Sequence, residues 1–231
     1  MKNKFNLIFI IGNEGTGHHL FEKCISATPV PYSTLHKLIH KYFNVKTTPD
    51  EQSKIKIQIN ELTKNNIGTY CKESASFPFG RPADPLKSID IFGFYELFSS
   101  MPHVNLFFVV LTRNIIYSTL STKNRFDKNN SIFWAARLQE NCLSYINNQI
   151  QLIPEENYII VELSNIANNI KKFKIILEEK SKMNFKFNFN AVKISDNSKY
   201  FSNLYYDYLS KYFNETRLKQ FDFLKNNTYL L

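Results

Sequence analysis

Cysteine is scarce in this sequence, and long apolar runs are absent. The cysteines, Cys24, Cys71 and Cys142, lie far apart and form no C-x-x-C pair. Neither a zinc site of that type nor a disulfide framework is predicted, and we expect reduced thiols. No run approaches the roughly 18 apolar residues of a membrane span. The apolar run at 5–11 leads straight into a glycine-rich turn, which indicates a core strand rather than a signal peptide, and we expect a cytoplasmic protein.

The lysine of a nucleotide-hydrolysing P-loop is also missing. Gly12 and Gly17 have P-loop spacing, but His18 and His19 occupy the positions that need Lys and Ser or Thr. Imidazole is a poor substitute for a permanent ammonium and a poor ligand of Mg²⁺. We therefore expect the backbone N–H groups of this turn to bind phosphate without Mg²⁺-dependent hydrolysis. This argues against a kinase-like phosphotransferase.

Acidic residues are fewer than basic ones, and this imbalance favours an anionic partner. The 29 Lys and Arg residues and 20 Asp and Glu residues give a formal net charge of +9. Such a charge suits nucleotides, sulfated or phosphorylated ligands, nucleic acids or acidic surfaces, without choosing among them. Apolar residues make up 43% of 231 residues, enough for a folded core. No repeat or linker is evident, so one α/β domain is predicted over residues 1–231.

Apolar runs of strand length alternate with amphipathic helical patterns, which predicts parallel strands joined by right-handed crossovers. The predicted strands are 5–11, 69–72, 104–112 and 157–163, with an edge strand or extended loop at 185–189. Predicted helices begin near residues 20, 35, 49, 88, 114, 132, 164 and 203, with Ser88 and Ser164 as two of the caps. The first helix would carry Leu20, Phe21, Cys24 and Ile25 on one face, and the last would bury an aromatic stripe over 204–213.

Polar segments follow three of the predicted strands at their carboxyl ends. They are Gly12–Gly17, Lys72–Ser76 and Arg113. Ligands of parallel α/β sheets bind at this edge of the sheet. We therefore expect the three segments to converge on one cleft.

Two histidines have the spacing of a pair of metal ligands. His36 and His40 lie one turn apart on a predicted helix. No third ligand follows at a suitable spacing. A solvated helix face is the simpler interpretation, so no metal is expected.

The second anion-binding pattern is Arg113 at a strand end with Ser121 eight residues later. Arg supplies a forked, permanently charged donor, and its length allows it and the hydroxyl to reach one phosphate. Together with the glycine-rich turn, this pattern resembles the sulfotransferases that use 3′-phosphoadenosine 5′-phosphosulfate (PAPS). Residues 71–78 and 158–164 carry weaker similarity, so the resemblance spans roughly residues 5–180.

The resemblance implies a three-layer P-loop-like α/β fold, with a central parallel sheet flanked by helices. It also implies PAPS as co-substrate, no metal, and sulfuryl transfer to a hydroxyl or amine of a small-molecule or carbohydrate acceptor. Arg113 and Ser121 would hold the 3′-phosphate. The residues implied at the 5′-phosphosulfate are Gly12, Gly15, Thr16, Gly17, His18, His19 and Leu20. The catalytic candidates are His18, Lys72 and Glu73.

One departure from the family pattern concerns the leaving group. The family places Lys or Arg where this chain has Gly15. His18 or Lys72 would then have to stabilise the leaving phosphate oxygen. Glu73, His18 and His19 are all candidates for the base that accepts the proton of the acceptor.

A second departure concerns the C-terminal part of the chain. The family's cationic motif there has no clear counterpart, and Arg217 is the one substitute considered. The alternative function is therefore a non-catalytic protein that binds anions or nucleic acid on a P-loop-like scaffold. The sulfotransferase interpretation itself involves no nucleic acid, and it leaves the acceptor and the oligomeric state open.

Overall fold

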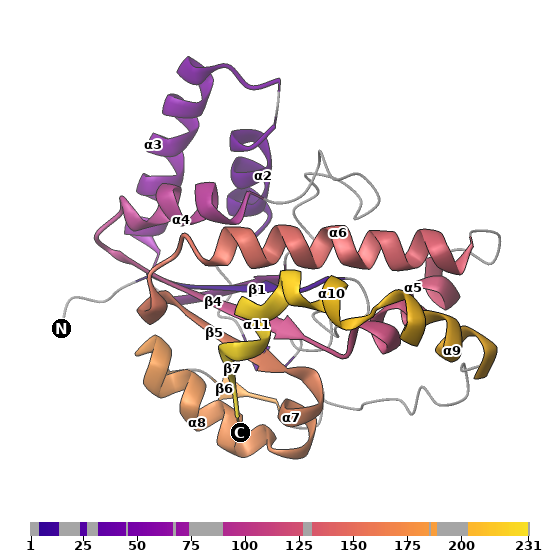
Figure 1. Ribbon diagram of the computed structural model, residues 1–231. Helices are drawn as coiled ribbons and strands as arrows, with labels where there is room; N and C mark the ends of the chain where they lie inside the picture. Colours follow the sequence, from indigo (N-terminus) through magenta and orange to yellow (C-terminus); the bar gives the residue numbers. More distant parts are fainter. Residues whose placement is uncertain are drawn as a thin grey trace.

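The structure is a computed structural model that describes residues 5–13, 24–26, 32–44, 46–66, 68–73, 90–126, 131–184, 186–188 and 203–230. At its centre is a five-stranded sheet in the order β3-β1-β4-β5-β7, and neighbouring strands are all parallel (Figure 1). The strands are β1 (Phe5–Ile11), β3 (Gly68–Glu73), β4 (Val104–Thr112), β5 (Tyr158–Glu162) and β7 (Thr228–Tyr229). The predicted α/β fold with a parallel sheet is confirmed, and so are four of these strands.

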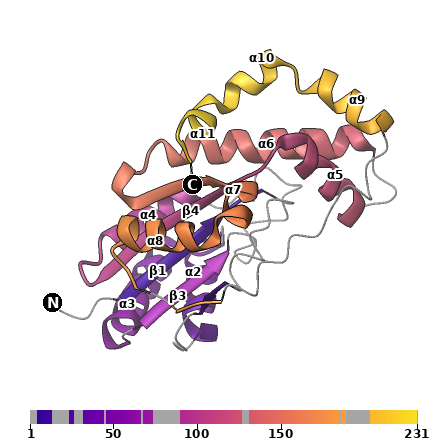
Figure 2. The same cartoon turned by 90° about the horizontal axis from the view of Figure 1, so that it is seen from below.

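Helices cover both faces of the sheet and complete three layers, as Figures 1 and 2 show. One face packs against α2 (Tyr32–Tyr42), α3 (Pro49–Asn65), α4 (Ile91–Ser99), α5 (Ile115–Phe126) and α6 (Ile132–Ile150). The C-terminal α9 (Asn203–Tyr212), α10 (Glu215–Leu218), the 3₁₀ helix η6 (Lys219–Phe221) and α11 (Asp222–Asn226) run along α6. The other face packs against α7 (Leu163–Asn168) and α8 (Ile170–Ser181), and the 3₁₀ helix η3 (Glu155–Asn157) leads into β5.

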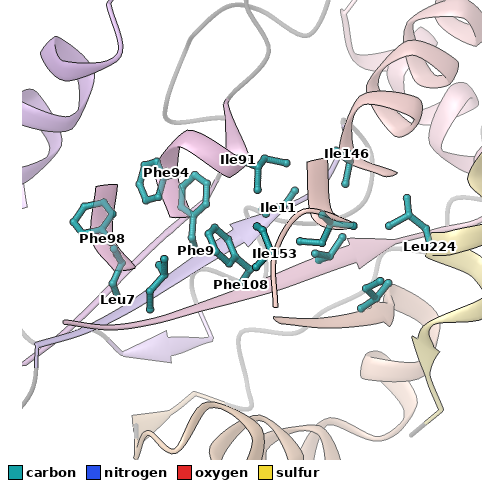
Figure 3. Close-up of a cluster of buried hydrophobic side chains, with 14 of the residues drawn as sticks. Leu7, Phe9, Ile11, Ile91, Phe94, Phe98, Phe108, Ile146, Ile153 and Leu224 are labelled. Carbon is teal, nitrogen blue, oxygen red and sulfur yellow. The ribbon is translucent and has the colours of Figure 1, made fainter. Parts of the chain in front are cut away.

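Alternate residues of β1 serve two separate cores. Phe9 belongs to the larger core, on the α4 and α6 side, whereas Ile8 belongs to the smaller core, on the α7 and α8 side. Figure 3 shows Phe9 between Phe94 of α4 and Phe108 of β4, and the rings of Phe9 and Phe94 stack at 4.3 Å between centroids. A strand that is buried on both faces needs apolar side chains in both directions, which is why residues 5–11 are almost entirely apolar.

Side-chain caps determine where helices begin. The hydroxyl of Thr48 accepts the backbone N–H of Glu51 at the start of α3, and the Glu51 carboxylate accepts the N–H of Thr48 at 2.9 Å. Caps of this kind stabilise a helix by about 1 kcal/mol. Ser131 caps α6 in the same way, accepting the N–H of Trp134 at 3.2 Å.

The cap predicted for α4 is wrong. The helix begins at Ile91 and is capped by Asp90, not Ser88: the Asp90 carboxylate accepts the N–H of Gly93 at 2.8 Å. A Cβ at position 93 would lie 2.7 Å from the Asp90 carboxyl carbon. The glycine that interrupts the helical pattern therefore makes room for the cap.

The single helix predicted from Ser164 onward is also wrong, because the chain forms two. α7 begins at Leu163, directly after β5, so that Ser164 lies inside the helix rather than at its cap. The backbone leaves the helical conformation at Asn169, with φ −133° and ψ 38°, as suits a residue whose side chain competes for backbone hydrogen bonds. The apolar face predicted for the second helix is buried in α8: Phe173, Ile176 and Leu177.

The predictions at the short strands need correction too. Ile25, predicted on a helix with Cys24, lies in β2 (Ile25–Ser26), where it pairs antiparallel with Phe187 of β6 (Lys186–Phe187). The edge strand predicted in this region is present at Lys186–Phe187, in a small second sheet of two strands. β7 completes the main sheet beside β5, and its two residues are too few to show a period.

The aromatic stripe over 204–213 is only partly buried, contrary to the prediction of a core helix. Leu209 and Phe213 are buried, whereas Leu204 is 77% exposed and Tyr205 and Tyr208 are close to 40% exposed. α9 thus presents tyrosines to solvent. None of the described helices is long and apolar enough to cross a membrane.

Candidate active site

The carboxyl ends of β1, β3 and β4 lie side by side at one edge of the sheet. The last residue of β1 pairs with Val110 of β4, and the residue before it pairs with Glu73, the last residue of β3. Gly12 directly follows β1, and Arg113 directly follows β4. Because all three strands run in the same direction (Figure 2), this edge brings together Gly12, Glu73 and Arg113.

Arg113 is a half-buried cation between β4 and α5. Its guanidinium carbon lies over the ring of Tyr117, in the first turn of α5, at 5.9 Å from the ring centroid. Burial lowers the pKa of Arg113, an effect that Tyr117 partly offsets, and a guanidinium stays charged at neutral pH. A held, partly desolvated cation beside the N-terminus of a 12-residue helix suits an anion, because the helix adds N–H donors there.

The hydroxyl groups of α5 offer a second set of polar atoms near this edge. Ser118 and Ser121 are three residues apart and therefore share a face of the helix. Ser121 is half-buried, whereas Ser118 is fully buried and its hydroxyl has no hydrogen-bond partner in the described part of the chain. A buried hydroxyl without a partner costs about 1–3 kcal/mol. The surrounding protein closes Ser118 off from a ligand, so the hydroxyl on this face of α5 that a phosphate can approach is that of half-buried Ser121.

A buried polar network connects the glycine-rich turn to α5, and sequence reasoning missed it. The side-chain amide of Asn13 donates a hydrogen bond to the side-chain carbonyl of Gln139 in α6. The Gln139 amide donates in turn to the hydroxyl of Thr122 in α5, at 2.7 Å. All three side chains are buried. The signal for it was a glutamine at a helix position four residues from buried Ala135 and Leu143, where an apolar side chain is expected.

The remaining predicted site residues divide into two groups. The backbone of Lys72 and Glu73 lies at the end of β3, where Lys72 pairs with Phe9 of β1, but their side chains are outside the described part of the structure. The rest of the glycine-rich turn lies outside the described residues altogether: Gly15, Thr16, Gly17, His18, His19 and Leu20. Their roles stay predictions.

The two histidines of α2 face each other. The ring centroids of His36 and His40 lie 4.9 Å apart in an edge-to-face arrangement. Within the described ranges, no group of three or more His, Cys, Asp or Glu side chains is arranged to hold a metal ion.

Arg217, the substitute considered for the C-terminal cationic motif, binds a carboxylate of the protein itself. Its guanidinium lies 2.8 and 2.9 Å from the two oxygens of Glu140 in α6 and stacks on Tyr212, 4.3 Å from the ring centroid. Glu140 also accepts hydrogen bonds from the Tyr212 hydroxyl and the Gln220 amide, both at 2.9 Å. Burial raises the pKa of Glu140, but these donors outweigh it, and the net pKa is lowered. The cluster fastens the C-terminal helices to α6.

Comparison with known proteins gives similarity at the level of structure alone. No protein-family model matches the chain, and no curated protein matches it. The sulfotransferase from Alicyclobacillus acidocaldarius superposes with a TM-score of 0.56 and 12% identity over 96% of each chain. The sulfotransferase domain of the Synechococcus PCC 7002 olefin synthase gives a TM-score of 0.50 and 12% identity over 100% of this chain and 97% of that domain.

Identities this low establish similarity of fold and no more. The superposition covers the strands, the helices on both faces and the carboxyl edge together, because nearly the whole of each chain is aligned. The parallel sheet in the order β3-β1-β4-β5-β7 agrees with it. The chain therefore has a sulfotransferase-like fold of the three-layer, P-loop-like α/β type.

Proposed function

We propose that this protein is a sulfotransferase that moves the sulfuryl group of PAPS to a hydroxyl or amine of a small-molecule or carbohydrate acceptor. The observation that carries the proposal is the position of Gly12 and Arg113, one residue beyond two hydrogen-bonded parallel strands of a sulfotransferase-like fold. A phosphate-binding turn and a held cation at adjacent strand ends suit a ligand with two separated anionic groups.

The two ends of PAPS would bind on different elements. Arg113 and Ser121, which are both half-buried near the carboxyl end of β4, would hold the 3′-phosphate. The turn that begins at Gly12 and continues through Gly17 and Leu20 would wrap the 5′-phosphosulfate with backbone N–H groups.

The proposed reaction is an in-line displacement at sulfur. The acceptor oxygen or nitrogen forms a bond to sulfur as the bond from sulfur to the bridging phosphate oxygen breaks. The acceptor's proton passes to a base, for which Glu73, His18 and His19 are the candidates, and adenosine 3′,5′-bisphosphate leaves. Negative charge develops on the bridging oxygen, and with glycine at position 15 the stabilising cation would be His18 or Lys72.

Calorimetric titration with adenosine 3′,5′-bisphosphate, without Mg²⁺ and at moderate salt, tests the proposal. We expect saturable one-to-one binding that Arg113→Ala weakens about tenfold to hundredfold, because the variant loses charge-assisted hydrogen bonds. Arg137→Ala is the matched control: this arginine is exposed on α6, over Phe133, and its loss should leave the affinity unchanged. No binding by a folded wild-type sample would remove the proposal.

The alternative of a non-catalytic anion or nucleic-acid binder draws on the net charge of +9 and on the glycine at position 15. It predicts binding to polyanions that weakens steeply as salt is raised. It also predicts no saturable nucleotide site. Titration with a single-stranded oligonucleotide over a salt series therefore separates the two functions.

A further inference from the structure

Gln139 lies between the two segments to which the proposed function assigns the two phosphates. Its carbonyl accepts from Asn13, the residue after Gly12, and its amide donates to Thr122, the residue after Ser121, at 2.7 Å. Its exposed fraction is 1%, as is that of Thr122, and that of Asn13 is 4%. One side chain thus joins the start of the glycine-rich turn to the helix that follows Arg113.

Packing alone does not account for a glutamine at this position. The surrounding buried face of α6 includes Ala135, Ala136, Leu138 and Leu143. A leucine or methionine would fill the same space without a polar group to satisfy, since a buried amide is tolerated only when hydrogen-bonded. What the glutamine adds is direction: two hydrogen bonds fix where its partners lie relative to each other.

We propose that Gln139 is a positioning residue that sets the spacing between the 5′ and the 3′ anion-binding segments, so that the site selects nucleotides phosphorylated at both positions. The inference rests on the proposed function. A ligand that binds through two anionic groups gains affinity from the second group only if the two anion-binding segments are held at the matching distance. Removing the connection made by Gln139 should therefore weaken the binding of a bisphosphate much more than the binding of a monophosphate, because a monophosphate uses one segment at a time.

The test compares two probes on the same variants. Dissociation constants for adenosine 3′,5′-bisphosphate and adenosine 5′-monophosphate are measured by calorimetry for the wild type, Gln139→Met and Asn147→Leu. Methionine keeps the length of the side chain and removes both hydrogen bonds. Asn147 is the control because it is a second buried amide of α6, two turns away, whose side-chain carbonyl accepts the N–H of Leu224 at 3.2 Å.

We expect Gln139→Met to raise the dissociation constant of the bisphosphate at least tenfold and that of the monophosphate less than twofold. Asn147→Leu should lower thermal stability and leave the ratio of the two constants unchanged. An unchanged ratio in folded Gln139→Met, or an equal loss for both probes, would overturn the inference while leaving the proposed function in place. Absence of bisphosphate binding in the wild type would instead remove the proposed function, and the inference with it.

A second pair of variants keeps the test decisive if Gln139→Met does not fold. Thr122→Val removes the hydroxyl that accepts from Gln139 with almost no change of shape, and Thr122→Ser restores it. Thr122→Val should reproduce the selective loss of bisphosphate affinity, and Thr122→Ser should recover it to within about threefold. Equal ratios in the two variants would contradict a positioning role.

Discussion

The Nε2 atom of His103 lies 2.9 Å from the hydroxyl oxygen of Thr63, and this contact joins the turn before β4 to α3. The Thr63 hydroxyl donates its own hydrogen to the carbonyl of Ile59 at 2.8 Å. His103 must therefore be the donor, with its proton on Nε2. Burial and the nearby Lys64 lower the pKa of His103, so the folded state favours the neutral ring.

The lowered pKa of His103 predicts that the folded protein loses stability in acid. Because the folded pKa lies below the unfolded value of about 6.5, the unfolded chain binds the proton first as the pH falls. The contribution of His103 to stability is complete above pH about 6.5 and declines below it, and the decline is small because solvent screens a partly exposed ring. Urea unfolding at pH 7.5 and 5.5 measures the decline. His103→Gln should reduce it, and an equal decline in both proteins would contradict the assignment.

The carboxylate of Glu140 is expected to be structural and not part of the nucleotide site. Glu140→Ala removes the acceptor shared by Tyr212, Arg217 and Gln220. It should lower the free energy of unfolding by roughly 1–2 kcal/mol, because hydrogen bonds to a charged group are lost. Calorimetric titration should show an affinity for adenosine 3′,5′-bisphosphate within about twofold of wild type.

Arg217→Ala tests the same expectation, a structural role outside the nucleotide site, from the other side chain of the Glu140–Arg217 ion pair. It should lower the thermal midpoint by less than Glu140→Ala does, since its side chain is 44% exposed. The affinity for adenosine 3′,5′-bisphosphate should again be close to that of the wild type. A variant with wild-type stability and weakened nucleotide binding would place Arg217 in the site and restore the role considered from the sequence.

The thiols should react in an order set by burial. Burial raises the pKa of Cys24 to about 11, and Cys71 is buried as well, whereas Cys142 is half-buried on α6. Thiolate is the reacting form, so iodoacetamide at pH 7.5 should modify Cys24 more than about a hundredfold slower than an unfolded thiol. Mass spectrometry of the folded protein should find Cys142 labelled first, and Cys142→Ser should abolish the early label. Early modification of Cys24 would show that its environment opens in solution.

The sequence was sufficient to predict an element of structure wherever a run of one residue type had one physical explanation. Uninterrupted apolar runs at 5–11 and 104–112 indicated strands covered on both faces, and the structure buries them in that way. Parallel strands then place Gly12 and Arg113 at the same edge of the sheet, and the structure adds that the two strands are neighbours. This much of the candidate site followed from pattern and topology.

The remainder depends on contacts between residues far apart in the chain, which local patterns do not encode. Asn13 and Gln139 are separated by 126 positions, and although a glutamine on the buried face of a helix signals that it needs a polar partner, nothing in its own segment says which residue that is. β7 is two residues long and exists because β5 provides an edge to pair with. The exposed tyrosines of α9 have the spacing of a buried stripe, and only the packing of the helix along one narrow face leaves Tyr205 and Tyr208 in solvent.

Tyr117 is expected to hold Arg113 in place by its ring and not by its hydroxyl. The guanidinium lies 5.9 Å from the ring centroid, and a cation over an aromatic face is stabilised by about 0.5–2 kcal/mol depending on solvent exposure. Tyr117→Leu should therefore weaken the binding of adenosine 3′,5′-bisphosphate between about twofold and thirtyfold, because the released Arg113 side chain must be ordered again when the ligand binds. Tyr117→Phe keeps the ring and should bind within about twofold of wild type. Calorimetric titration of both variants decides the matter: a loss in Tyr117→Phe as large as in Tyr117→Leu would mean that the hydroxyl itself contacts the ligand.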